Sequence, residues 1–241
     1  MTLHQVPVAN KDKVIIVGAG IGGLASSLRL SHLGYDVEVI ERANSAGGKL
    51  RTITGSTGEI DIGPTVLTLL PIFQKLFKSV GEDIFEHIDL VRQKIIARHW
   101  WPDGTSLDLY DDFETSRDAI MKFSGSASAI EFEKYFHDTR DLFSCFDLPV
   151  MQNPRPSMLD MNLAVLSNPK ILSKLHPLRT LSSLLNYKFQ DKRLRQLFGR
   201  YATYVGGSPL ESPALLSLVW QAEAQGVWSI KGGMRKLARV I

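Results

Sequence analysis

A glycine-spaced turn near the N-terminus, formed by Gly18, Gly20 and Gly23, limits the folds open to this chain. An apolar, β-branched run at 14–17 directly precedes the turn and predicts a strand, and an apolar helical pattern follows it as far as Leu33. In such a unit the first glycine permits the tight turn, the second admits a pyrophosphate, and the third lets the helix pack on the strand. The free N–H groups of the helix N-terminus would face the phosphates. The segment therefore predicts a βαβ nucleotide-binding unit.

An acidic residue follows the next predicted strand. Glu41 ends the apolar run at 37–40 and lies 18 residues beyond Gly23, near the spacing of about 20 expected for an acid that binds ribose hydroxyls. The glycine spacing alone also occurs in packing turns without a ligand, but the strand, helix and acid together favour a nucleotide site. The candidate residues for the ADP half of the nucleotide are Gly18, Ala19, Gly20, Gly23 and Glu41.

A second glycine turn indicates which of the possible dinucleotide cofactors this unit would bind. Arg42 follows the acid, and Gly47, Gly48 and Lys49 come shortly after it. A nicotinamide-binding domain does not need this second turn. The arrangement resembles the ER-x(4,5)-GG-[RK] signature of flavoproteins in the amine oxidase and phytoene desaturase group. That resemblance implies that the glycines and cations lie along the ribose and diphosphate of FAD, so FAD is the cofactor we expect.

Composition excludes several other classes of site. The net charge of +3 in 241 residues gives no strong attraction for nucleic acid, so we expect no nucleic-acid partner. The single cysteine, Cys145, excludes an intramolecular disulfide and a CxxC metal site. The six histidines lack HxxxH and HxH spacing. We therefore expect no metal.

We expect the chain to contact a membrane at the membrane surface without spanning it. Residues 1–12 lack the apolar core of a signal peptide, and no run of 18 apolar residues occurs. Short apolar helices with basic margins are predicted over 149–190, which suits either a membrane interface or a core helix with a solvated face. We expect a cytoplasmic protein, peripheral at the inner membrane.

Three regions follow from the pattern along the chain. Residues 1–85 are expected to form the FAD-binding βαβ domain, in which a short strand over 58–62 and a helix over 67–77 follow the βαβ unit. Residues 86–225 are expected to form a substrate region. Its added strands lie over 86–110, with 95–100 and 106–110 joined by a hairpin turn, and helices are expected over 112–123, 126–146, 191–204 and 213–220. Residues 226–241 would begin a return to the FAD domain. The fold class is therefore α/β: a Rossmann-type FAD domain with an added sheet and a mostly helical region.

Several blocks resemble the carotenoid (phytoene) desaturase family of flavoproteins. In chain order they are VIIVGAGIGGLA, ERANSAGGKLRT, DIGPTVLT, LRQLFGRYATYVGGSP and GVWSIKGGMRKLA. Within the family, HWWPDGTSLDLY and the segment from GRYATYVGGSP onward look most like hydroxyneurosporene or methoxyneurosporene desaturases. The resemblance implies a carotenoid substrate, FAD-dependent 3,4-desaturation of a 1-hydroxy or 1-methoxy carotenoid, and Gly63, Pro64 and Thr65 near the isoalloxazine. It identifies no catalytic side chain.

The length of the chain bears on activity. Family members are about twice as long, and the helix that begins at Met234 runs to the last residue without a stop signal. We therefore expect a truncated chain that is inactive alone, with uncovered first strands and uncovered apolar faces over 191–220. The alternatives are another FAD oxidoreductase of the amine oxidase superfamily, a nicotinamide-dependent dehydrogenase, and an inactive remnant.

Overall fold

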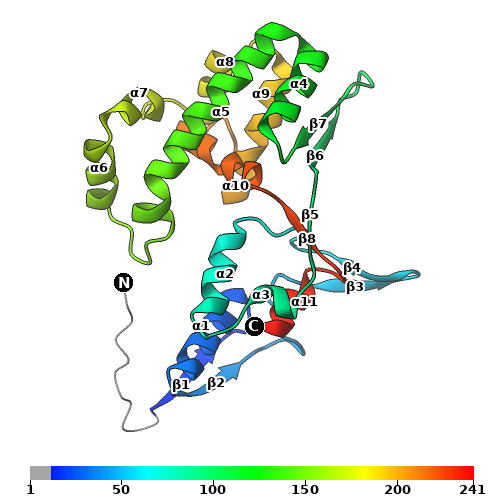
Figure 1. Cartoon of the computed structure of the whole chain (residues 1–241), viewed down its shortest axis with the longest axis vertical. Helices are drawn as coiled ribbons and strands as arrows, with labels where there is room; N and C mark the ends of the chain where they lie inside the picture. Colours follow the sequence, from blue (N-terminus) through cyan, green and yellow to red (C-terminus); the bar gives the residue numbers. More distant parts are fainter. Residues whose placement is uncertain (1–11) are drawn as a thin grey trace. The chain divides into compact units, whose positions relative to one another are not determined.

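The computed structural model describes residues 12–241, which divide into two compact units (Figure 1). The first comprises residues 12–93 together with 227–241, and the second comprises residues 94–226. The C-terminal segment therefore belongs to the same unit as the glycine turn.

The first unit begins with the expected βαβ arrangement. Strand β1 (Lys13–Val17) pairs in parallel with β2 (Asp36–Ile40), and helix α1 (Ile21–His32) connects them. Val14 lies beside Val37 in this register. The α/β class predicted from the sequence is confirmed.

Two elements differ locally from the expectation. The predicted strand at 58–62 is β4 (Gly58–Asp61), and it pairs with an unexpected strand, β3 (Thr52–Gly55), in an antiparallel hairpin. Helix α2 (Leu70–Lys78) begins three residues after Leu67, because Leu67 instead forms a β-bridge with Trp228. A short helix, α3 (Ile84–His87), follows.

The C-terminal segment completes the core of the first unit. Strand β8 (Trp228–Ile230) pairs antiparallel with β5 (Leu90–Arg92), and helix α11 (Arg235–Val240) follows it. One set of added strands was predicted over 86–110 in the substrate region, but β5 lies in the first unit. The buried core side chains here include Leu50, Leu67, Phe77, Ile84, Ile230 and Leu237.

One face of the β1–β2 sheet is left uncovered. The two strands form a sheet of their own, and Ile15, Val17 and Ile40 lie on the same face of it. Val17 is 85% exposed and Ile15 55%. Because parallel sheets are normally covered on both faces, the expectation of incompletely covered first strands agrees with the structure.

The second unit opens with a hairpin and two helices. Strands β6 (Ile95–Trp100) and β7 (Ser106–Tyr110) pair antiparallel as expected. Helices α4 (Phe113–Ser124) and α5 (Ser126–Phe146) are separated by Gly125. The Asp112 side chain accepts a hydrogen bond from the N–H of Thr115 and so caps α4.

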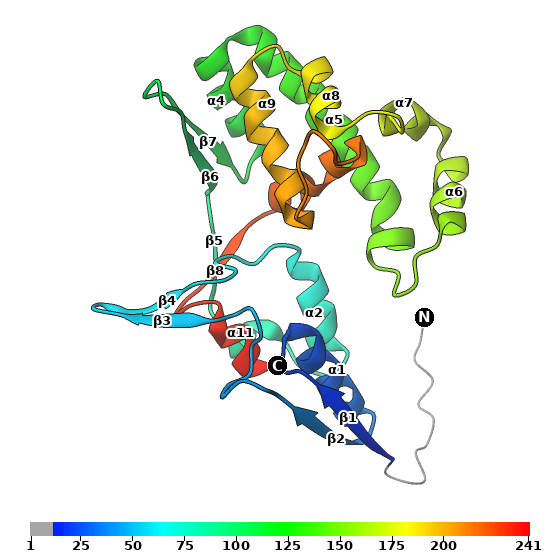
Figure 2. The ribbon, with the colours of Figure 1, turned by 180° about the vertical axis from the view of Figure 1, so that it is seen from behind.

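The rest of this unit consists of short helices around α5 (Figure 2). They are η1 (Asp147–Met151), α6 (Met158–Ser167), η2 (Pro169–Ile171), α7 (Leu172–Leu175), α8 (Leu181–Lys188), α9 (Lys192–Gly199), η3 (Arg200–Val205), η4 (Ala214–Trp220) and α10 (Gln221–Ala224). The helix expected over 191–204 ends at Gly199, and that expected over 213–220 is a 3₁₀ helix. In the 3₁₀ helix η3, residues three apart eclipse one another, which lets Tyr201 and Tyr204 both donate to Glu223.

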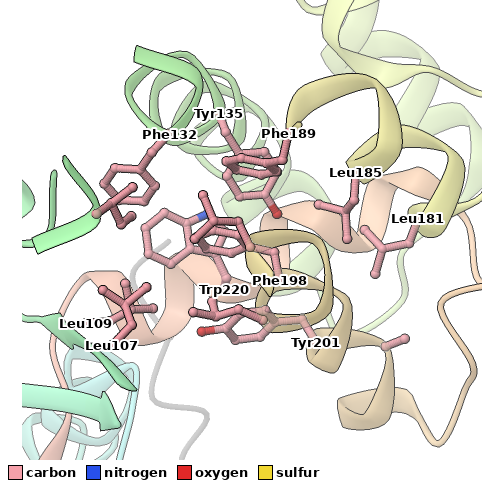
Figure 3. Packing of buried hydrophobic residues seen from close by; sticks show 14 residues of the cluster. Leu107, Leu109, Phe132, Tyr135, Leu181, Leu185, Phe189, Phe198, Tyr201 and Trp220 are labelled. Carbon is pink, nitrogen blue, oxygen red and sulfur yellow. The ribbon is translucent and has the colours of Figure 1, made fainter. Parts of the chain in front are cut away.

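An aromatic core holds the second unit together (Figure 3). Phe198 lies 5.4 Å from Trp220 and 6.0 Å from Phe132 between ring centroids. The indole N–H of Trp220 donates to Thr139 at 2.8 Å. Leu194, Leu197 and Phe198 are buried, so the expectation of uncovered apolar faces over 191–220 was wrong for α9 and η4, although Tyr204, Val205 and Leu210 between them are exposed. Helix α5 covers those faces from within the same unit.

Candidate nucleotide-binding site

Two of the three expected glycines are required by the shape of the first turn. Gly18 has a φ of +100°, and its N–H donates to the carbonyl of Ile40 at 2.7 Å. A Cβ on Gly23 would lie 2.0 Å from the carbonyl oxygen of Gly18. The start of α1 therefore packs directly against the end of β1, as expected for a nucleotide-binding turn.

Glu41 connects the end of β2 to the same turn. Its Oε2 accepts a hydrogen bond from the N–H of Ala19, and its Oε1 accepts one from the N–H of Ala43, both at 2.7 Å. These backbone donors, Ala43 first and Ala19 second, hold the pKa of Glu41 below its usual value. The carboxylate is therefore ionised and fixed in orientation beside the glycines.

The second glycine turn lies against the first. The N–H of Gly47 donates to the carbonyl of Ala19 at 2.8 Å. Gly48 has a φ of +59°, and a Cβ there would approach the Cα of Gly20 to 2.9 Å. Residues 28 positions apart in sequence thus form one cradle of backbone, in which a side chain on Gly48 would collide with Gly20, whereas a Cβ on Gly20 would make only ordinary contact at 4.0 Å.

A cavity of about 480 Å³ adjoins this cradle within the first unit. Glu41, Arg42, Gly48 and Lys49, all expected site residues, line its wall. The other lining residues are Ala43, Ser45, Ala46, Leu50, Arg51, Thr52, Ile62 and Arg235. The cavity therefore contains the acid and the cations that the sequence pattern singled out.

Two cations at this cavity were missed from the sequence. Arg51 directly follows the second glycine turn, and Arg235 comes from α11 near the C-terminus. One guanidinium nitrogen of Arg235 donates to the hydroxyl of Thr52 at 3.3 Å. In the sequence, the glycine pair in GGMRKLA was the available signal for Arg235. Because this block lies far along the chain from the two glycine turns, nothing in the local pattern connected Arg235 with this site.

Asp61 holds the segment that carries Arg235. Its Oδ2 accepts a hydrogen bond at 2.9 Å from the N–H of Met234, at the start of α11. A Cβ on Gly233 would lie 3.4 Å from the same carboxylate. Within residues 12–241, the buried Oδ1 of Asp61 has no hydrogen-bond partner.

The expected flavin-ring residues lie beside the second glycine turn. A Cβ on Gly63 would come within 1.9 Å of the Lys49 carbonyl oxygen, and the N–H of Ile62 donates to the Arg51 carbonyl at 2.9 Å. Pro64 and Thr65 are exposed and do not line the cavity. Their place beside an isoalloxazine ring stays a prediction.

Comparison with known proteins agrees with this geometry. The family model described as an NAD(P)-binding Rossmann-like domain matches residues 16–82. A hydroxyneurosporene desaturase from Cereibacter sphaeroides is 45% identical over 226 residues, which is 94% of this chain and 46% of that protein. The chain is a homologue of the hydroxyneurosporene desaturases. The resemblance to carotenoid desaturases inferred from the sequence blocks is confirmed.

A second hydroxyneurosporene desaturase, from Rhodobacter capsulatus, is 42% identical and aligns with 96% of this chain and 47% of its own length. The chain therefore spans about half the length of the curated relatives that it matches. A putrescine oxidase structure shares the fold, with a TM-score of 0.59 and 18% identity over 95% of this chain and 47% of that one. The Rossmann-like match supports a nucleotide cofactor.

Two kinds of feature are absent from the part of the chain that the structure describes. Within 12–241, no helix has the length and apolar character needed to cross a bilayer. The same residues contain no cluster of three or more His, Cys, Asp or Glu side chains arranged to hold a metal ion. Cys145 is half-buried, and burial raises the pKa of its thiol, so the geometry does not make it a nucleophile.

Proposed function

We propose that the first unit binds FAD. Gly18, Ala19, Gly20, Gly23 and Glu41 would hold the ADP half, and Arg42, Gly47, Gly48 and Lys49 would lie along the ribose and diphosphate. The single observation that carries this proposal is the contact between Gly20 and Gly48, where the backbones of the two turns meet so closely that a Cβ on Gly48 would lie 2.9 Å from the Cα of Gly20. Such a surface permits the close approach of a diphosphate.

The second turn also favours FAD over a nicotinamide cofactor. The cavity beside it collects cations from residues 42–51 and from Arg235 on α11. A nicotinamide-binding βαβ unit needs neither the second glycine turn nor a cation from the far end of the chain. Arg235 and Arg51 are therefore additions to the proposed diphosphate-binding set.

We propose carotenoid desaturation as the activity of the whole protein to which this chain corresponds. Proteins that it resembles over nearly its full length, at 45% and 42% identity, are named hydroxyneurosporene desaturases. A bound flavin would supply the two-electron oxidation that unactivated C–H bonds require. The contribution of this chain would be to bind and orient the cofactor. Because the chain spans about half of those relatives, we expect turnover only with the remaining half present.

The proposed substrate also favours an enzyme that acts at a membrane surface. A carotenoid is a long apolar molecule that partitions into bilayers rather than water. We therefore propose peripheral association with the cytoplasmic face of the inner membrane, and Gly63, Pro64 and Thr65 as the residues nearest the flavin ring.

Flavin titration tests the cofactor directly. We expect the purified full chain to bind FAD more tightly than NAD⁺ in fluorescence titration, and a Gly20→Val variant to lose that binding. The Gly22→Val variant is the matched control, because a Cβ at position 22 meets open space. Equal FAD affinity of the two variants would contradict the proposed site.

Expression in a carotenoid-producing host tests the activity. The chain alone should leave the pigment spectrum unchanged, and co-expression with the half of a hydroxyneurosporene desaturase that this chain does not match should shift it to longer wavelength. Retained FAD binding without any pigment shift in the co-expressing cells would favour a remnant or another substrate.

A further inference from the structure

A cavity of about 410 Å³ lies in the second unit and is separate from the proposed cofactor site. Residues of α8, α9 and η3 line it together with Pro209, and all of them belong to residues 94–226. Figures 1 and 2 show α8 and α9 side by side. The volume of the cavity lies within the range of about 300–1,000 Å³ typical of small-molecule pockets, so it is large enough for a ligand.

A buried glycine forms the floor of this cavity. Gly199 is the last residue of α9, and a Cβ there would lie 3.7 Å from both the Cδ1 of Leu185 and the Cβ of Pro209. The N–H of Ser182 donates to the carbonyl of Pro209 at 2.7 Å, which holds this wall against α8. The space that a side chain at position 199 would fill is therefore left as an apolar slot between Leu185 and Pro209.

Arg195 brings a positive charge to the rim of the slot. One of its Nη nitrogens donates to the side-chain oxygen of Asn186 at 2.9 Å, and the other donates to the backbone carbonyl of Gln190 at 3.3 Å. Both acceptors are uncharged, so these hydrogen bonds orient the guanidinium without neutralising it. Because a guanidinium has five N–H groups, others stay available to a ligand.

Gln196 adds a donor whose orientation is fixed. Its side-chain oxygen accepts a hydrogen bond from the indole N–H of Trp101 at 3.0 Å. Because an indole can only donate, this hydrogen bond identifies which end of the amide is the oxygen. The NH₂ group of Gln196 is therefore the end left for a ligand in the cavity.

The charges at the cavity favour an anion. No acidic side chain is among the described residues that line it. Arg200, the second cation on the wall, is already paired with Glu223, which lies outside the lining. Arg195 is thus the cation without an acidic partner at the cavity. An apolar slot with such a guanidinium at its rim is complementary to a carboxylate that carries an apolar chain.

We propose that this cavity binds a monocarboxylate with a short alkyl chain. The chain would lie over Gly199, between Leu185 and Pro209, and the carboxylate would accept hydrogen bonds from Arg195 and from the NH₂ group of Gln196. This site would act independently of the proposed cofactor site, because all of its residues belong to the second unit. A chain that fails to bind FAD would still bind the carboxylate.

Isothermal titration calorimetry with the full chain and sodium octanoate tests the proposal. We expect octanoate to bind at one site, at least about tenfold more tightly than 1-octanol, which lacks the charge. Acetate lacks the alkyl chain and should also bind at least about tenfold more weakly than octanoate. These differences would show that the cavity recognises both the charge and the chain.

Two substitutions separate the two parts of the site. Arg195→Gln removes the charge and should weaken octanoate binding by about tenfold. Its matched control is Lys192→Gln, which removes an exposed cation of the same helix outside the lining and should have no effect. Gly199→Ala should weaken octanoate binding by about tenfold because the methyl group fills part of the slot. Alanine suits the φ of −66° at this position and its Cβ would meet only ordinary contacts, so the melting curve should be unchanged.

Four results would overturn the proposal. They are no octanoate binding by the unsubstituted chain, equal affinity for octanoate and 1-octanol, tighter binding of octyl phosphate than of octanoate, and unchanged octanoate affinity in Arg195→Gln or in Gly199→Ala. The third result would assign the cavity to a phosphate ester instead of a carboxylate.

Discussion

Asp61 accepts a hydrogen bond from the backbone N–H of Met234 at 2.9 Å, across 173 positions of sequence. Asp61 ends the β3–β4 hairpin and Met234 precedes α11, so this contact anchors the helix that brings Arg235 to the cavity. The position of Arg235 in the proposed cofactor site therefore depends on a contact between the two stretches of chain, 12–93 and 227–241, that form the first unit.

Removing this contact should loosen α11. We expect Asp61→Ala to speed amide hydrogen exchange over residues 235–240 and to lower stability by about 1 kcal/mol, as loss of a helix cap does. Asp61→Asn keeps an acceptor oxygen and should restore most of the protection. If exchange in Asp61→Ala were unchanged at α11 but faster throughout the unit, the local role assigned to Asp61 would be wrong.

Two adjacent glycines of α1 should respond in opposite directions to alanine. Gly23→Ala should destabilise the first unit by about 2 kcal/mol, because the new Cβ would meet the Gly18 carbonyl oxygen at 2.0 Å. Gly22→Ala should stabilise it by about 0.5 kcal/mol, because the position is open and alanine favours helix. Urea denaturation of both variants checks the difference, and similar values would contradict the tight packing of the turn.

The charge of Glu41 should matter for cofactor affinity. Glu41→Gln replaces one acceptor oxygen with an NH₂ group facing the N–H of Ala19 or Ala43. We expect FAD affinity to fall by about tenfold or more, in line with loss of hydrogen bonds to a charged group. Glu38→Gln, on the strand that precedes Glu41 and paired with Lys13 at the surface, is the control and should leave the affinity unchanged.

Glu223 should be the most sensitive polar residue of the second unit. Its buried carboxylate accepts from Arg200, Tyr201 and Tyr204. Burial, together with the hydrogen bond to this carboxylate, raises the pKa of Tyr204 to about 12. We expect Glu223→Gln to cost about 2 kcal/mol and to lower the pKa of Tyr204, read by ultraviolet titration. The exposed Glu211→Gln should change neither, and a Tyr204 pKa insensitive to Glu223→Gln would argue against the pairing.

Asp191 should make the second unit sensitive to acid. Hydrogen bonds from Arg193 lower the pKa of Asp191 well below its ordinary value, against the opposing effect of burial and with a further hydrogen bond from Ser124. Since the folded pKa is below the unfolded value of about 3.9, the ionised carboxylate stabilises the fold above that pH. That stability is lost as the pH falls toward the folded pKa.

The free energy of unfolding should therefore decline between about pH 4 and pH 2 more steeply in the unsubstituted chain than in Asp191→Asn. Chemical denaturation across this range measures both slopes. Parallel curves would show that other carboxylates carry the acid sensitivity.

Local spacing was sufficient to predict much of this protein. The βαβ unit, the hairpin over 95–110 and the helices around Gly125 each depend on residues close in sequence, where periodicity and glycine placement act directly. Glu41 was predictable for the same reason, because it directly follows the first strand after the glycine turn. The resemblance to carotenoid desaturases came from the same contiguous blocks.

Tertiary structure alone decided the remainder. Four features join segments that are distant in sequence. Gly20 contacts Gly48, β5 pairs with β8, Arg235 lines the cavity beside the second glycine turn, and apolar side chains within 191–220 are buried against α5. Such contacts depend on which apolar faces cover one another and on which buried polar groups find partners. Those are properties of the packed chain, and no local pattern encodes them.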